Sequence, residues 1–295
     1  MNQPNKMRVA VLIALGLGLA ACQKQSDSTT QAASDTQASA PVQQPKPSFS
    51  ADIQTVKVNL PECKGESCPE FQVQRLNSNV PEINRVIDQA ILKTLKDNLD
   101  FSESAASDAS ATQPSQERSS DAFGAEVIRY ANTFEGMVND LKKMGASPQI
   151  SLHIQPKVMP SPEGLVTIQL NADNFLGGAH GAASQQYFTF ELAHPKSLKL
   201  DDVLEKNQKP ALEKLAYAQF KQWVVSQKLS DNLANYEQTW PFTLSRNFYF
   251  DDKGLTLQYA QYEIGPYVVG MPSFSLTYAQ LKGIVKPQYL PKVGS

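Results

Sequence analysis

The stretch NFLGGAHGAASQQYFTFELAHPKSLKLDDVL, residues 174–204, decides the fold of this chain. It opens on a short loop in which three glycines, Gly177, Gly178 and Gly181, surround the histidine His180. Glycine adopts positive φ angles without strain and lets two backbones approach closely. The sequence GGAHG therefore predicts a tight loop of defined conformation, which we call the glycine loop.

Segments typical of β-strands flank the glycine loop on both sides. Residues 165–171 before it and 187–192 after it are rich in the branched and aromatic residues that strands favour. A turn at His194 and Pro195 closes the second strand, and a short helix is expected at 200–204. The stretch thus predicts a pair of strands joined by an unusual loop and followed by a helix.

The rest of the folded chain alternates between strand and helix patterns and predicts an α+β protein. We expect two α+β subdomains with mainly antiparallel sheets packed against helices, covering residues 51–148 and 149–295. A low-complexity run at 102–120 is expected to be a flexible insertion. Further strands are expected at 55–60, 71–76, 149–159, 248–250 and 255–259, and further helices at 77–99, 122–144, 209–228 and 278–285.

Two of the expected helices have informative details. The first should be capped by Ser78 or Asn79 and carry Pro81 in its first turn. The helix at 209–228 has an apolar stripe, which favours packing on a sheet over a membrane-facing or partner-facing surface. Its stripe residues are Leu212, Leu215, Ala216, Phe220, Trp223 and Val224.

The N-terminus has the pattern of a lipoprotein signal peptide. Basic residues precede an apolar run too short to anchor the chain across a bilayer, and the run ends on Leu-Ala-Ala before Cys22. We therefore predict a signal peptide at 1–21 and a lipid-modified Cys22, against the alternative of an ordinary secretory signal followed by a chance cysteine. Gln23 after the cysteine favours the outer membrane, facing the periplasm, if the source is Gram-negative.

The amino-acid composition distinguishes an N-terminal tether from the folded region, and the net charge argues against nucleic acid as a partner. Residues 22–50 are rich in Gln, Ser, Thr, Ala and Pro, so they cannot bury enough apolar surface to fold and are expected to form a disordered tether. The net charge of −2 argues against a nucleic-acid partner.

Two further cysteines, Cys63 and Cys68, are separated by four residues. In an exported protein, such a pair is most simply a disulfide. A metal site would need more ligands close by, and a redox-active pair more often has two intervening residues. We predict a structural disulfide, with the metal and redox alternatives less favoured.

Candidate catalytic residues are few, and we expect no enzyme activity, no metal and no cofactor. The histidines His153, His180 and His194 do not stand at the spacing of known metal-ligand motifs. We expect His180 to have a structural role, with its ring nitrogens tying the glycine loop to neighbouring backbone groups. A hydrolase centred on His180 is the competing hypothesis.

The segment YEIGPYVVGMPSF, residues 262–274, carries the candidate binding residues. Its two prolines and two glycines prevent a regular strand, while its aromatic side chains could either fill the core or face solvent. In the second case Tyr262, Pro266 and Tyr267 would form a rigid exposed ridge, since aromatic residues on preorganised loops often anchor partners. The sequence leaves both interpretations open.

Two motifs in this order resemble one known family. The GGAHG stretch with its following strand and LKLDDVL is similar to the extracellular domain of the RsiV anti-sigma factor, and GLTLQYAQYEIGPYVVGMPSFSLTYAQLKGIV at 254–285 is similar to its second motif. The region from about residue 53 more loosely resembles the smaller domain that precedes it, which is shared with PdaC-type polysaccharide deacetylases.

The resemblance implies a binding function at the cell envelope. In RsiV this type of domain binds lysozyme outside the cell, so we expect a lipid-anchored envelope protein that binds or inhibits lysozyme or another envelope protein. The protein would be attached to the membrane through the lipid on Cys22. The alternative is a peptidoglycan-binding or glycan-binding envelope protein without catalytic activity, whose aromatic residues stack on sugars.

Overall fold

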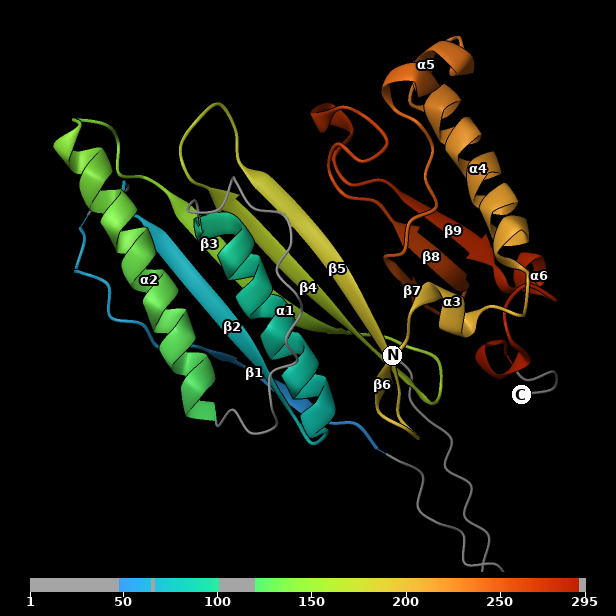
Figure 1. Cartoon of the computed structure of the whole chain (residues 1–295), viewed down its shortest axis with the longest axis horizontal. Helices are drawn as coiled ribbons and strands as arrows, with labels where there is room; N and C mark the ends of the chain where they lie inside the picture. Colours follow the sequence, from blue (N-terminus) through green and yellow to red (C-terminus); the bar gives the residue numbers. More distant parts are fainter. Residues whose placement is uncertain (1–47, 65–66, 101–119, 292–295) are drawn as a thin grey trace, which may run out of the picture. The chain divides into compact units, whose positions relative to one another are not determined.

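The computed structural model describes residues 48–64, 67–100 and 120–291 (Figure 1). The predicted signal peptide, Cys22, nearly all of the predicted tether and nearly all of the predicted insertion lie outside these residues. The described chain consists of helices and mainly antiparallel sheets, which confirms the α+β class.

The larger sheet is formed by six strands in sequential order. All neighbouring pairs are antiparallel except β2 and β3, which run parallel. Because the sheet takes strands from both sides of residue 148, the domain boundary expected there does not separate its strands. The strands are β1 (Ala51–Thr55), β2 (Glu70–Ser78), β3 (Ser151–Met159), β4 (Leu165–Phe175), β5 (Ala182–Glu191) and β6 (Lys196–Ser197).

Two helices connect β2 to β3 and cover one face of this sheet (Figure 1). They are α1 (Pro81–Leu99) and α2 (Ser120–Lys143). Parallel neighbours need a crossover connection of this kind, whereas antiparallel neighbours can be joined by a hairpin. The first hydrophobic core lies between these helices and the sheet, and includes Val73, Ile87, Ile91, Phe134, Leu152, Ile154, Ile168 and Phe190.

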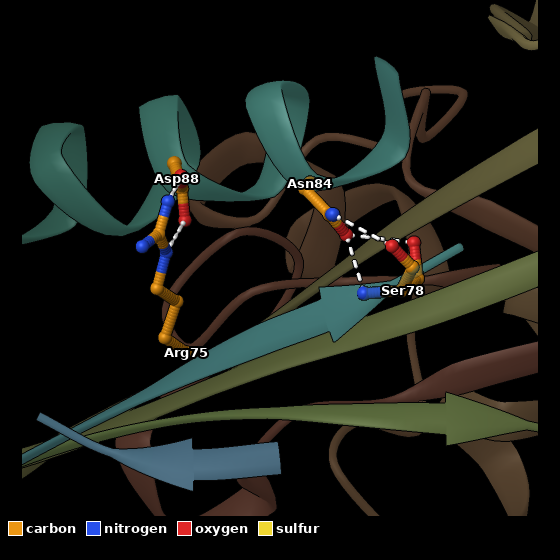
Figure 2. Close-up of polar contacts among 4 residues, drawn as sticks. All are labelled: Arg75, Ser78, Asn84 and Asp88. Atoms are coloured by element: carbon orange, nitrogen blue, oxygen red, sulfur yellow. Dashed lines mark hydrogen bonds and ion pairs between the residues drawn. The ribbon is translucent and has the colours of Figure 1, made fainter. Parts of the chain in front are cut away.

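Polar contacts join β2 to α1 at two points (Figure 2). The Arg75 guanidinium holds Asp88 through two hydrogen bonds, the one from Nε to Oδ1 measuring 2.9 Å, and also lies 4.6 Å from the Phe123 ring. Burial raises the pKa of Asp88, and Arg75 opposes that shift. Near the start of α1, the Asn84 Oδ1 accepts hydrogen bonds from the Ser78 backbone N–H and hydroxyl at 2.9 and 2.6 Å.

The expected side-chain cap of α1 is therefore wrong. The N-cap residue is Val80, whose side chain cannot accept a hydrogen bond, and Pro81 begins the helix as expected. The Ser78 hydroxyl donates to the Asn84 side chain and accepts from the backbone N–H of Val80 itself, so it does not bond to the N–H groups of the first turn. Proline has no N–H group of its own, so one fewer donor needs a cap here.

The smaller sheet belongs to a second hydrophobic core. Its strands lie in the order β7 (Phe248–Phe250), β8 (Gly254–Gln258), β9 (Ser273–Thr277), all antiparallel. The helices near it are α3 (Leu200–Val203), α4 (Lys209–Ser226), α5 (Leu233–Thr239) and α6 (Tyr278–Leu281), together with the 3-10 turns η1 (Tyr267–Val269) and η2 (Pro287–Tyr289). The core includes Phe220, Phe250, Leu257, Tyr259, Ile264 and Leu281.

Helix α4 packs its apolar stripe into this core. Leu212, Ala216, Phe220 and Val224 are buried, which confirms the prediction of a helix packed on a sheet. Across the described ranges, no helix has both the length and the apolar character needed to cross a membrane.

The two sheets meet at β5 and β7. The rings of Tyr187 and Tyr249 stack with their centroids 4.4 Å apart. The Asn247 side chain accepts a hydrogen bond from the Tyr187 N–H at 2.8 Å and donates one to the Gln185 carbonyl at 2.7 Å. Burial, together with the neighbouring Tyr249, raises the pKa of Tyr187 to about 12.

Several expected boundaries need correction. The first strand is β1 at Ala51–Thr55 and not 55–60, because pairing with β2 ends there except for one further bond from the Val56 N–H to the Val73 carbonyl. The closing helix ends at Leu281, since Gly283 has a φ of 75° and Val285 turns back to pair with Leu204. Helix α5 was not expected.

The predicted disulfide is present between β1 and β2. Cys63 and Cys68 are bonded, with their Cα atoms 5.7 Å apart, within the usual range for a disulfide.

Candidate functional site

The glycine loop lies between β4 and β5 and has a conformation that its glycines make possible. Gly177 and Gly178 have φ angles of 94° and 109°, which side chains rarely allow. At Gly181, an added Cβ would lie 2.5 Å from the Asn174 carbonyl oxygen. The loop is tight, as expected, and it turns the backbone so that His180 is exposed at its end.

His180 contacts one backbone group and one side chain. Its Nδ1 lies 3.0 Å from the carbonyl oxygen of Gly181, and its Nε2 lies 3.4 Å from the Tyr262 hydroxyl. A carbonyl oxygen only accepts, so Nδ1 must carry the hydrogen and Nε2 accepts from Tyr262. The expectation that both nitrogens bind backbone is therefore wrong for Nε2, whose partner is a side chain 82 residues away.

Tyr267 completes the contact between the glycine loop and the segment after β8. Its ring stacks on His180 with centroids 4.1 Å apart and planes 26° from parallel. Its hydroxyl donates to the Gly181 carbonyl at 3.1 Å, so this one oxygen accepts from both Tyr267 and His180. The arrangement holds the two rings face to face.

Trp240, which directly follows α5, extends the group of rings. Its centroid lies 6.4 Å from that of Tyr262, and Tyr262 lies 5.8 Å from Tyr267. We call these four residues, His180, Tyr262, Tyr267 and Trp240, the ring cluster. Three separate segments of the chain contribute to it, and two of them contain the residues singled out from sequence.

Exposure decides between the two interpretations of the segment 262–274. Tyr262 is 49% exposed, Tyr267 36% and Val268 85%, whereas Ile264 and Phe274 are buried. Part of the segment therefore fills the core while another part faces solvent. Of the three residues expected in the outward ridge, Tyr262 and Tyr267 are exposed and Pro266 is half-buried, and Val268 is exposed beside them.

Side chains of α4 and α5 fix the backbone of this segment. An added Cβ at Gly265 would lie 2.8 Å from the Tyr236 hydroxyl and 2.9 Å from the Trp223 ring, so any larger residue would have to displace these side chains. The Tyr236 hydroxyl donates to the Ile264 carbonyl at 2.9 Å. These contacts preorganise the exposed part of the segment.

Sequence reasoning missed a second cluster, at His153 on β3. Its Nδ1 lies 2.9 Å from Asp173 and its Nε2 3.1 Å from Glu70, which belong to β4 and β2. The pairing of β2, β3 and β4 brings these three side chains together, which the sequence could not show. The alternation of buried and exposed residues along β3 indicates only that His153 lies on the face of the sheet opposite the helices. Within the described ranges, no group of three His, Cys, Asp or Glu side chains could hold a metal ion.

Comparisons with known proteins agree with this architecture. Residues 201–279, which include Trp240, Tyr262 and Tyr267, match the model of a family described as proteins of unknown function, DUF3298. A crystal structure of a DUF3298 family protein from Pseudomonas aeruginosa PAO1 is 28% identical, covers 84% of this chain and 98% of its own, and superimposes with a TM-score of 0.58. These matches support a relationship to the DUF3298 family.

Two more distant relatives carry less information. A DUF3298 family structure from Bacteroides fragilis, 18% identical over 81% of this chain and 93% of its own with a TM-score of 0.55, shows likeness of fold alone. The peptidoglycan-N-acetylmuramic acid deacetylase PdaC of Bacillus subtilis is 24% identical over 162 residues, or 54% of this chain. The matched region spans 34% of PdaC, about a third of that enzyme's length.

Proposed function

We propose that this chain is a cell-envelope binding protein without catalytic activity, and that the ring cluster with Val268 is its partner-binding surface. The observation that carries the proposal is the exposure of Tyr262, Tyr267 and Val268 on a backbone that is already fixed. Side chains held in place before binding lose little entropy when a partner arrives, and aromatic residues of this kind often dominate interface energies.

A non-catalytic role is supported by how His180 is used. Its Nδ1 lies 3.0 Å from the Gly181 carbonyl oxygen and its Nε2 lies 3.4 Å from the Tyr262 hydroxyl, so both ring nitrogens contact groups of the glycine loop and the ring cluster themselves. The stacked Tyr267 also covers one face of the imidazole. The histidine therefore serves to position the two tyrosines.

The proposed partner is a lysozyme, which follows from the resemblance of both sequence motifs to the lysozyme-binding domain of RsiV. Both tyrosines of the ring cluster fall inside the second of those motifs and inside the residues that match DUF3298. A lipid on Cys22 would hold the protein at the outer membrane, facing the periplasm, where it would meet such an enzyme. The name of the relative PdaC, which refers to peptidoglycan, supports an envelope setting.

The test is binding of hen-type lysozyme to the immobilised full chain. Tyr267→Ala and Val268→Ala should each weaken binding, and the tyrosine change should cost about 2 kcal/mol or more, the usual hot-spot scale. The melting temperature should change little for Val268→Ala, whose side chain is 85% exposed. Tyr267→Ala also removes the stacking on His180 and the bond to Gly181, so it should lower the melting temperature modestly. Val225→Ala, which removes a valine that is 71% exposed on α4, is the matched control and should bind as the unmodified chain does.

Two results would reject the proposal. One is the absence of lysozyme binding by the unmodified chain. The other is unchanged binding by both Tyr267→Ala and Val268→Ala, which would place any lysozyme site elsewhere.

A further inference from the structure

A pocket of about 280 Å³ opens beside the ring cluster, between α5 and the start of η1. Trp240 belongs to both the pocket and the ring cluster. The lining residues are Leu229, Ser230, Asn235, Tyr236, Thr239, Trp240 and Pro266.

The walls of the pocket are built by local hydrogen bonds, so the pocket does not depend on a ligand. Asn232 caps α5 by accepting from the Asn235 backbone N–H at 3.1 Å, and the Ser230 hydroxyl donates to the Asn232 carbonyl at 2.9 Å. Tyr236 is 7% exposed and bonds to the Ile264 carbonyl, which joins α5 to the segment before Pro266.

No residue of the lining is charged. Among the described residues, the side chains of Asn235 and Thr239 are exposed and have no hydrogen-bond partner. The Ser230 hydroxyl donates to the Asn232 carbonyl and accepts from the Asn232 N–H at 3.1 Å, which leaves its oxygen one further lone pair. The pocket can therefore form hydrogen bonds to a ligand through one amide and two hydroxyls, but it has no charged side chain to form an ion pair. A neutral ligand with several hydrogen-bonding groups fits this lining better than a charged one does.

The same walls carry apolar faces. Leu229, Trp240 and Pro266 contribute them, and small-ligand sites commonly combine apolar and polar surfaces. A pyranose ring has this dual character, since its C–H faces pack on aromatic rings while its hydroxyls bond at the rim. The volume lies just below the roughly 300–1,000 Å³ typical of ligand pockets, which suits no more than one sugar ring.

The carboxamide of Asn235 narrows the class of sugar. An amide side chain both donates and accepts, so it can pair with the N–H and the C=O of an acetamido group, while Leu229 offers an apolar contact for the methyl. Beyond the pocket, Tyr262 lies next to Trp240 with planes 24° from parallel, which gives a following sugar a second ring to stack on.

We propose that this pocket binds an N-acetylated amino sugar of a glycan strand. This inference goes beyond lysozyme binding, because it assigns a second ligand of a different class to a neighbouring surface. The two share Trp240 and Tyr262 but differ in their principal contacts, which are Asn235 and Thr239 for the sugar and Tyr267 and Val268 for the protein.

The experiment titrates the purified full chain with a trimer of N-acetylglucosamine, by calorimetry and tryptophan fluorescence and without lysozyme. Glucosamine and glucose trimers are the control ligands. We expect saturable binding of the acetylated trimer and at least tenfold weaker binding of the other two. Asn235→Ala should raise the Kd about tenfold, as expected for a site that loses hydrogen bonds. Gln238→Ala, an exposed amide of α5 outside the pocket, should leave the Kd unchanged.

The fold check is the melting temperature of each variant, and Thr239→Val provides a second variant that removes a hydroxyl at constant size. The proposal is overturned if the acetylated trimer does not bind, if the glucosamine trimer binds equally well, or if Asn235→Ala and Thr239→Val both bind normally. A chain that captures lysozyme but ignores the sugar refutes the pocket alone. A chain that binds the sugar but not lysozyme supports the pocket and refutes the proposed protein partner.

Discussion

Tyr267 donates a hydrogen bond to the carbonyl oxygen of Gly181, which lies 86 residues earlier in the chain. The same oxygen accepts from the ring of His180, so a single backbone atom positions both stacked rings. The glycine loop and the segment after β8 consequently form one surface. Any change that moves the Gly181 carbonyl should disturb the whole ring cluster.

We therefore expect Gly181→Ala to be destabilising. Its Cβ would lie 2.5 Å from the Asn174 carbonyl, so the loop must shift, at a cost of about 1–3 kcal/mol for overpacking. Chemical denaturation measures the loss, and the ring-current shift of the His180 imidazole reports movement away from Tyr267. Gly136→Ala in α2, where the added Cβ meets nothing within 4 Å apart from its own stretch of helix, should instead be neutral or stabilising.

Asn247 should contribute measurably to stability where the two sheets meet. Asn247→Ala removes its bonds to the Tyr187 N–H and the Gln185 carbonyl, and leaves partly buried groups unpaired. We expect a loss of about 1–3 kcal/mol in the free energy of unfolding. Arg246→Ala, at the exposed neighbouring position, is the control and should change stability by no more than about 0.5 kcal/mol. Equal effects of the two changes would contradict the prediction.

Tyr187 should make stability fall at alkaline pH. Its pKa is raised from 10.0 to about 12 in the folded chain, chiefly by burial, so the unfolded chain ionises first. The stabilising contribution is complete below the unfolded pKa and is lost as pH rises through the folded pKa. Urea denaturation from about pH 9 to about pH 12 should show a shallower decline for Tyr187→Phe. Part of the decline should remain, because burial also raises the pKa of Tyr278 to about 12.

The Cys63–Cys68 disulfide should matter for stability and not for binding. It closes a loop of few residues, so its removal in a Cys63→Ser, Cys68→Ser variant should cost roughly 2–3 kcal/mol at most. Thermal unfolding of the variant and of the reduced parent should agree. A large loss of lysozyme or sugar binding in the folded variant would show that the bridge also shapes a binding surface.

Cys22 should attach the protein to a membrane. Cys22→Ala in the expressing cell should leave the chain soluble or unprocessed, since the thiol that would carry the lipid is gone. Membrane fractionation and the mass of the N-terminal peptide measure the outcome. If the variant still sediments with membranes as the parent does, lipidation at this residue is not the anchor.

Much of the secondary structure could be predicted because it depends on neighbouring residues. The helical period of α4 correctly indicated which side chains are buried, and the three glycines of the glycine loop correctly indicated its tight turn. Errors arose where a distant strand set the boundary. The first strand ends at Thr55 because its pairing with β2 ends there, and α6 ends at Leu281 because Val285 pairs with Leu204.

Several individual residues of the candidate site could be predicted from the sequence, but the contacts between them could not. His180 and Tyr267 were singled out separately, while the contribution of Trp240 was missed because a tryptophan after a short helix carries no local signal of function. The His153 cluster was missed for a similar reason, since its carboxylates Glu70 and Asp173 lie on two other strands.

The sequence by itself determined the α+β class, the positions of most strands and helices, the glycine loop and the disulfide, because periodicity and turn chemistry act over a few residues. Only the tertiary structure decided that β2 pairs in parallel with β3, that His180 meets Tyr262 and Tyr267, and that Tyr267 is exposed while Pro266 is half-buried. Those features are set by packing between segments tens of residues apart, where many side chains compete for the same space and no single stretch of sequence contains the answer.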